Sequence, residues 1–263
     1  MASIREILNY HKMDRRLYER VLGLGRLPTS ARNIVALWMW LELMGIDVIR
    51  YLQNITASTQ LLNFVNEAEA ILNVIRQQSP PPSDNEALPF TSHFATEPIN
   101  LRFFYFHSDV VMRGLTYLLD GVGTIIFNDQ LNYMANTYET AVSLARQQGM
   151  RPVTMPVELA MQFNSRAVPS SEDHRSLFIA FSKGSTLRME EITEYFNERL
   201  GHCIEKVMVE DTMVGVMRPM YGRVVFESEA PIEILLSGEQ MVMFVVKGNN
   251  VWGRRYVPSA RRS

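Results

Sequence analysis

The sequence predicts a chain of two parts, an all-α helical bundle over residues 1–148 followed by an α+β domain over residues 175–258. Apolar residues recur at helical spacing in the first part, whereas the second contains short runs of strand length that are rich in Val, Ile and Phe. Between them, residues 149–174 contain Gly, Pro and Ser without a sustained period, which is typical of a linker.

The composition is that of a soluble globular protein. Of the 263 residues, 47% are hydrophobic and 21% are charged, and the net charge is −2. The single cysteine, Cys203, excludes an internal disulfide framework and a cysteine-rich zinc site. The first residues lack the apolar core of a signal peptide, and the apolar run 34–41 is far too short to span a bilayer. We therefore expect a protein of the nucleus or cytoplasm with no membrane partner.

Helical periodicity and capping residues predict the elements of the first part. The predicted helices cover residues 3–10, 15–22 after an Asp14 N-cap, 30–44, a turn or two from Asp47, 56–78, a segment near Asn100, 109–127 and 129–148. Residues 103–106 form an unbroken aromatic run. Because consecutive helical side chains fan out by about 100°, we expect these four rings to belong to the core rather than to an aromatic cage.

The second part has the order strand, helix, strand, strand, helix, strand, with a hairpin of two strands in the last place. Strands are expected at 175–182, 203–210, from Tyr221, at 241–246 and at 251–257, and helices at 188–200 and 228–237. Residues 247–250, Lys-Gly-Asn-Asn, predict a hairpin between the last two strands. This βαββαβ order predicts a ferredoxin-like antiparallel sheet of four or five strands, with both helices on one face.

Alternation along the runs 177–182 and 219–226 gives each strand a buried and an exposed face. The residues predicted to be buried are Leu177, Ile179, Phe181, Gly222, Val224 and Phe226. Phe178 and Tyr221 then point to the opposite face. Two rings on adjacent strands of an open sheet form a stacking platform for unpaired bases.

These two runs and the order of elements resemble the RNA recognition motif over about a third of the chain. The run 177–182 resembles the six-residue motif of its first strand, and 219–226 the eight-residue motif of its third strand. The resemblance implies binding of single-stranded RNA, with Phe178 stacking on a base and Tyr221 contacting a sugar or base. The sequence departs from the motif at Pro219, where a basic residue is usual, and at Arg223, where a second exposed aromatic is usual.

The predicted RNA-binding residues are Phe178, Tyr221, Arg223, Arg254 and Arg255. Arg223 either stacks its guanidinium on a base or is a solvated strand residue. The last ten residues contain four arginines and no acid, including Arg261 and Arg262 of a basic tail at 259–263. Such a tail follows the phosphates of a nucleic acid, or it serves only solubility.

No catalytic, cofactor or metal site is predicted. Residues 183–186, Lys-Gly-Ser-Thr, have lysine before glycine and lack the earlier glycine of a phosphate loop. The five histidines show no metal-ligand spacing, and His202 and Cys203 form a pair without further partners. We therefore expect a protein that is not an enzyme.

Two functional classes follow from these features. In the first, the sheet binds single-stranded RNA and the helical domain makes protein contacts. In the second, the chain is a non-enzymatic protein–protein adaptor whose sheet has lost RNA binding. An open sheet face favours RNA binding, whereas burial of both Phe178 and Tyr221 favours the adaptor.

Overall fold

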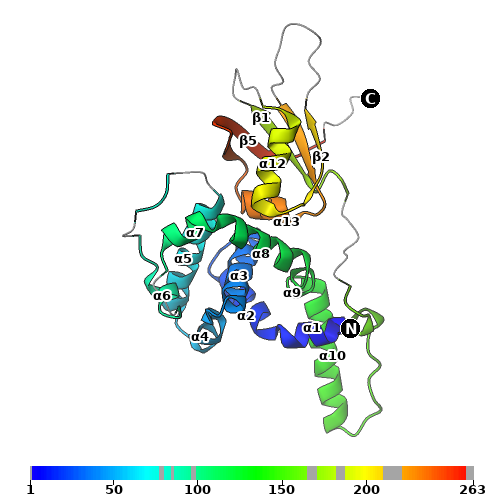
Figure 1. Cartoon of the computed structure of the whole chain (residues 1–263). Coiled ribbons are helices and arrows are strands. Elements are labelled where there is room, and N and C mark those ends of the chain that lie inside the picture. The colour runs from blue at the N-terminus through cyan, green and yellow to red at the C-terminus, as the bar shows by residue number, and fades with distance from the viewer. Residues whose placement is uncertain are drawn as a thin grey trace.

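The computed structural model describes residues 2–76, 80–83, 86–95, 99–164, 171–181, 187–209 and 221–258. Among these residues, helices occupy the chain up to residue 147, and a five-stranded antiparallel sheet forms in the C-terminal part (Figure 1). The helices before the sheet are α1 (Ile4–Tyr10), α2 (Lys12–Gly23), α3 (Pro28–Leu43), α4 (Val48–Asn54), α5 (Ser58–Arg76), α6 (Pro89–Ser92), α7 (Leu101–Phe106), α8 (Ser108–Asp120), α9 (Gly123–Ile126), α10 (Asp129–Gln147) and α11 (Val157–Ala160).

The C-terminal part alternates strands and helices. Its elements are β1 (Ser176–Phe181), α12 (Met189–Leu200), β2 (Ile204–Val209), β3 (Tyr221–Phe226), α13 (Ala230–Leu236), β4 (Val242–Val246) and β5 (Asn249–Arg255). The structure is thus of the predicted mixed class. The predicted turn at 183–186 and the loop between β2 and β3 lie outside the described residues.

Among the helix boundaries that differ from the prediction, two have a clear local cause. Asp14 lies in the first turn of α2 instead of preceding it, and its Oδ2 is 2.7 Å from His11 Nδ1. An acidic residue is favourable both at the N-cap and in the first turn of a helix, so the sequence alone did not distinguish these two positions. The predicted helix 109–127 is broken after Asp120, where the Gly121 amide donates to the Tyr117 carbonyl (3.0 Å).

Helix α3 is the centre of the helical part. It is apolar on all sides, and both Trp38 and Trp40 are buried, because α2, α4, α5, α8 and α13 pack around it. Gly114 allows α8 to approach it closely. A β-carbon at this position would lie 2.2 Å from Trp40 Cδ1.

The aromatic run 103–106 was wrongly predicted to be wholly core. Only Phe104 is fully buried, while Phe103 and Phe106 are exposed. Helix α7 packs mainly on α5, and one contact face holds only one of several consecutive side chains.

The strand order of the sheet is β2-β3-β1-β5-β4, with every neighbouring pair antiparallel. The predicted hairpin joins β4 to β5 through Lys247 and Gly248, whose φ angles are 47° and 80°. These left-handed conformations are those of a type I′ turn. Strand β5 begins at Asn249, two residues before the predicted start.

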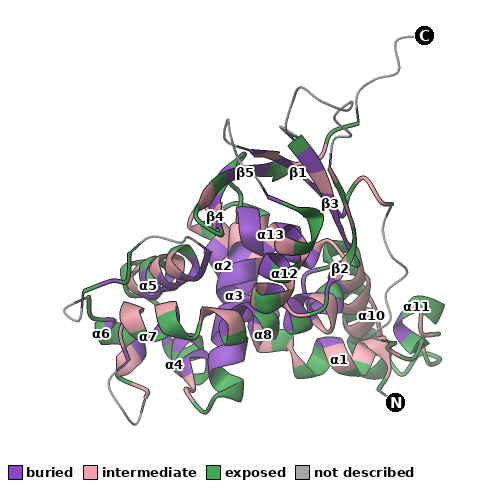
Figure 2. Cartoon of the chain, turned by 45° about the horizontal axis from the view of Figure 1, so that its top comes forward, coloured by how far each residue is buried: buried purple, intermediate pink, exposed green. Residues whose placement is uncertain are grey.

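Helices α12 and α13 lie between the sheet and the helical part (Figure 2). The predicted inner-face residues Leu177, Ile179, Val224 and Phe226 are fully buried, and the rings of Phe196 and Phe226 meet edge-on at 5.7 Å. On their other side, α12 and α13 contact α8, and α13 also contacts α3. The sheet and the helical part therefore share one continuous core.

The C-terminal end of α13 is capped by side chains of the helical part. Asn33 Nδ2 donates to the Glu233 carbonyl (3.0 Å), and Arg76 Nη1 donates to the Leu236 carbonyl (2.9 Å). Each of these carbonyls also accepts a backbone hydrogen bond, from the Ser237 and Glu239 amides (both 2.8 Å). The side chains of the helical part therefore add a second donor to each carbonyl at this helix end, where a carbonyl has two lone pairs to satisfy. Arg76 is itself buried, and burial lowers its pKa.

Part of the predicted linker, 149–174, contacts α1. The Ile4 amide donates to the Met161 carbonyl, and the Phe163 amide to the Ala2 carbonyl, each at 2.9 Å. The division into two domains at this stretch stays a prediction.

In the described part of the chain, no helix combines the length and the apolar character needed to cross a bilayer.

Gly114 generates the first testable prediction. Ala usually stabilises a helix interior by about 1 kcal/mol relative to Gly, but the methyl group would collide with the buried indole of Trp40. Because overpacking costs about 1–3 kcal/mol, we expect Gly114→Ala to lower the urea midpoint. Gly23→Ala is the control, since a β-carbon at Gly23 meets nothing within 4 Å. Equal midpoints for the two variants would contradict the close packing of α3 and α8.

Asp120 generates a prediction about pH. Burial raises the pKa of this carboxyl above its ordinary value of 3.8, although the Ser228 hydroxyl donates to it (2.7 Å). The folded chain therefore holds the proton more tightly than the unfolded chain. The stability that this proton provides is fully present below the unfolded pKa and is lost as the pH rises through the folded pKa. We expect Asp120→Asn to raise the free energy of unfolding by about 1 kcal/mol at about pH 7, and by little at about pH 4.

Urea unfolding at the two pH values measures this effect. The matched control is Asp109→Asn, at the exposed start of the same helix. If Asp120→Asn raised the free energy of unfolding by the same amount at both pH values, ionisation of Asp120 would not be the cause of the stabilisation.

Candidate functional site

The face of the sheet that points away from α12 and α13 holds most of the predicted site residues. In the β1–β3 pair, Phe178 lies opposite Arg223 and Ala180 opposite Tyr221. In the β1–β5 pair, Phe178 lies opposite Arg254 and Ala180 opposite Trp252. We call five of these residues the open face: Phe178, Ala180, Tyr221, Trp252 and Arg254.

Phe178 and Tyr221 form a stacked ring pair at the middle of this surface. Their centroids are 6.0 Å apart and their planes differ by 24°. Tyr221 is 47% exposed and Phe178 is half-buried. The guanidinium carbon of Arg254 lies 4.4 Å from the centroid of the Phe178 ring, within the range of a cation–π contact. Two rings and one cation thus meet on the same face.

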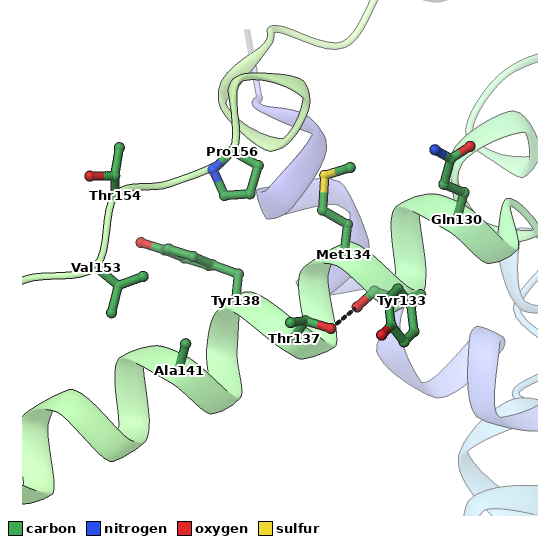
Figure 3. A pocket seen from close by; sticks show the side chains of 9 residues that line it. All are labelled: Gln130, Tyr133, Met134, Thr137, Tyr138, Ala141, Val153, Thr154 and Pro156. Atoms are coloured by element: carbon green, nitrogen blue, oxygen red, sulfur yellow. Dashed lines mark hydrogen bonds between the residues drawn. The ribbon is translucent and has the colours of Figure 1, made fainter.

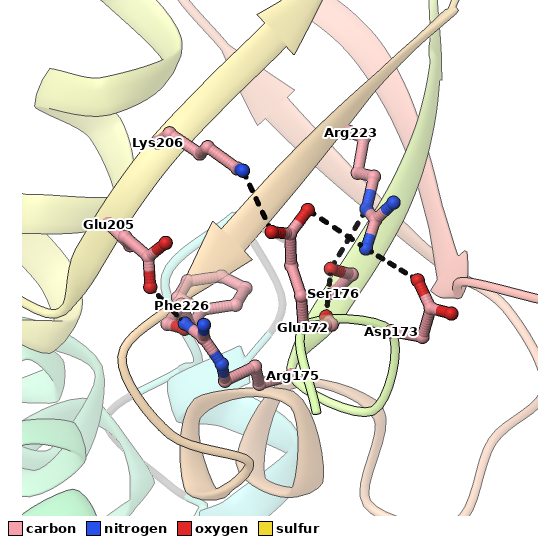
Figure 4. Close-up of polar contacts among 8 residues, drawn as sticks. All are labelled: Glu172, Asp173, Arg175, Ser176, Glu205, Lys206, Arg223 and Phe226. Carbon is pink, nitrogen blue, oxygen red and sulfur yellow. Dashed lines mark hydrogen bonds and ion pairs between the residues drawn. The ribbon is translucent and has the colours of Figure 1, made fainter. Parts of the chain in front are cut away.

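Arg223 is held by the chain at one end of the sheet (Figure 4). Its Nε donates to Ser176 Oγ (2.9 Å), and its Nη2 donates to Asp173 Oδ1 (2.8 Å) and is 3.4 Å from Glu172 Oε1. The guanidinium carbon also lies 3.9 Å from the centroid of the Tyr256 ring. Arg223 is therefore neither a fully solvated strand residue nor a side chain that projects alone from the sheet.

Glu172 and Asp173, which we term the acidic turn, neutralise the cations at this end. Lys206 Nζ donates to Glu172 Oε2 (2.8 Å), and this hydrogen bond holds the pKa of the Glu172 carboxyl below its ordinary value. Ser176 and Val225 are fully buried here although their register places them on the outer side. The outer side of the sheet is consequently covered at this end and accessible at the open face.

Arg255 is separated from Arg254 because neighbouring strand residues point to opposite faces. Arg255 lies opposite Leu177, an inner-face residue. Its Nη1 donates to the His174 carbonyl (3.2 Å) and is 3.8 Å from Glu229 Oε2. The structure thus brings Phe178, Tyr221 and Arg254 together, holds Arg223 at the covered end and places Arg255 elsewhere. Pro219, Arg261 and Arg262 lie outside the described residues.

Trp252 was not among the residues predicted for the site. It is 42% exposed and lies between Ala180 of β1 and Met243 of β4. The signal was present in the sequence, because Trp252 is two residues from Arg254 and must share its face. The prediction selected the arginines of this strand for their charge and did not follow the alternation along the whole strand.

A groove of about 440 Å³ lies elsewhere, between α10 and the segment after it (Figure 3). Its residues are Gln130, Tyr133, Met134, Thr137, Tyr138, Ala141, Val153, Thr154 and Pro156. Among the described residues, no carboxylate, imidazole or thiol lines it. The groove thus offers apolar contact together with the hydroxyl groups of its tyrosines and threonines.

The thiol of Cys203 is also unsuited to nucleophilic chemistry. Burial, followed by the nearby charges of Glu227 and Asp120, raises its pKa to about 12. A thiol is nucleophilic as the thiolate, which such a pKa suppresses at neutral pH. In the part of the chain that the structure describes, no cluster of three or more His, Cys, Asp or Glu side chains could hold a metal ion.

Comparisons of the chain with protein-family models, with curated proteins and with solved structures give no match. The assignment of a role to the open face therefore depends on its own geometry.

The two arginines of the outer side generate a paired prediction. Arg223→Ala would leave the acidic turn without its principal cation, so we expect the free energy of unfolding to fall by about 1–2 kcal/mol. Arg254 pairs with no carboxylate in the described part of the chain. Arg254→Ala should therefore change the free energy of unfolding by about 0.5 kcal/mol or less. Urea unfolding of both variants measures the difference, and equal losses would contradict the distinct environments of the two side chains.

Proposed function

We propose that this protein binds single-stranded RNA through the open face. The single observation that carries the proposal is the stacked pair of Phe178 and Tyr221, half-buried and exposed, respectively, beside the Arg254 guanidinium. Unpaired bases stack on such rings, and a cation beside them attracts the phosphates. The proposed activity is binding, without a catalytic step.

The sheet order supports this proposal. Strands β2, β3, β1 and β5 are adjacent in that order, so the two strands that resemble the motif strands, β1 and β3, are neighbours at the centre. We propose that β1, α12, β2, β3, α13 and β5 form the ferredoxin-like core expected of an RNA recognition motif. Strand β4 then extends it by one edge strand.

Charge limits the expected affinity. Arg223 and Lys206 are paired with the acidic turn, so they do not add to the positive potential of the open face. Each phosphate contact contributes through release of a counterion, and Arg254 supplies one such contact. We therefore propose binding in the micromolar range, with little preference among sequences, because ring stacking accepts every base.

A protein-interaction adaptor is the second candidate. The observation that favours it is the exposed Met243 beside Trp252 on the β4 side of the sheet. Methionine side chains adapt to varied apolar partners. The helical part, whose Phe103 and Phe106 are exposed, would then contribute to the same assembly.

The experiment is a binding titration on the full chain, because α13 is capped by Asn33 and Arg76 of the helical part. Fluorescence anisotropy is followed with a labelled single-stranded RNA pool of mixed sequence and about eight nucleotides. We expect Phe178→Ala and Tyr221→Ala each to weaken binding about ten-fold, since stacking contributes about 1–3 kcal/mol per base. Arg254→Ala should weaken binding of all sequences and reduce the salt dependence.

Tyr133→Ala is the matched control, because this exposed residue belongs to α10, a helix that lies away from the sheet (Figure 1). Unchanged urea midpoints of the ring variants would show that the fold is intact. Equal affinity of wild type and the Phe178→Ala/Tyr221→Ala double variant would reject the open face as an RNA site and favour the adaptor.

A further inference from the structure

We propose that Trp252 is a third stacking position for single-stranded RNA, beside those supplied by Phe178 and Tyr221. This inference rests on the proposed function and extends its site across β5. The indole is 42% exposed, similar to the 47% of Tyr221, and it lies on the same side of the sheet.

The register places the three rings around one small residue. Ala180 lies opposite Tyr221 on β3 and opposite Trp252 on β5, so these two rings flank Ala180. Neighbouring strands are about 4.8 Å apart, which puts the two backbone positions about 10 Å from each other. Phe178 is two residues along β1 on the same face. The methyl group of Ala180 leaves the space between the larger rings free of a bulky side chain.

Spacing and charge fit an extended polyanion with splayed bases. The three aromatic residues come from three adjacent strands, in the order β3, β1 and β5. Arg254 belongs to the same face as Trp252 and is two residues away, and no residue of the open face is acidic. A strand of RNA crossing the sheet from β3 to β5 would thus place successive bases on Tyr221, Phe178 and Trp252 and a phosphate near Arg254.

The distribution of tryptophans makes this contact directly measurable. The chain contains three tryptophans, and Trp38 and Trp40 are buried in α3 with 1% and 6% exposure. A base stacked on an exposed indole would quench Trp252 alone. Tryptophan emission of the wild-type full chain is therefore recorded while unlabelled mixed-sequence RNA of about eight nucleotides is added.

We expect the emission to fall along the same curve as the anisotropy titration. Trp252→Phe should abolish this quenching and keep the affinity within about three-fold, because phenylalanine still stacks. Trp252→Ala should weaken binding about five-fold or more. Tyr133→Ala, on α10, should keep both the quenching and the affinity of wild type, and urea unfolding checks that each variant is folded.

The outcomes separate this inference from the proposed function. The role of Trp252 would be overturned if Trp252→Ala bound RNA with wild-type affinity and RNA did not quench the emission of the wild-type chain. If Phe178→Ala and Tyr221→Ala bound weakly in the same experiments, the two-ring site would still stand. If the wild-type chain did not bind RNA, both the role of Trp252 and the proposed function would be overturned, and the open face would be assigned to protein interaction.

Discussion

The buried layer of α12 and α13 is the constraint on which the rest of the structure depends. These helices cover the inner face of the sheet and are themselves covered by α3 and α8. Asn33 and Arg76 of the helical part donate hydrogen bonds to carbonyls at the end of α13, so separating the layers would break these bonds and expose apolar surface. One face of the sheet is thereby committed to the core, and only the other is left for binding.

That remaining face is divided by electrostatics. At one end the acidic turn engages Arg223 and Lys206 beside the buried Val225, so the cations at this end are neutralised by carboxylates of the chain itself. Across the rest of the face lie aromatic rings and Arg254, which has no carboxylate partner among the described residues. Placing the acids beside Arg223 confines the available positive charge to the ring-bearing half of the sheet.

Periodicity predicted the elements more reliably than their ends. The buried faces of β1 and β3 followed from alternation, because side-chain direction is a local property of a strand. The break at Gly121 and the start of α2 before Asp14 were missed, since several residues satisfy the same capping rules. The rings at 103 and 106 were misassigned because burial of a short helix depends on which helix it meets, here α5.

By itself, the sequence determined that Phe178 and Tyr221 point away from the core, since each strand has only two faces and its apolar side must be buried. Only the tertiary structure decided what surrounds them. The contact of Arg223 with the acidic turn and the position of Trp252 beside Ala180 join segments that are far apart in the chain. Such neighbours are fixed by strand register and loop packing, which depend on the hydrogen bonding of the whole sheet and leave no local pattern.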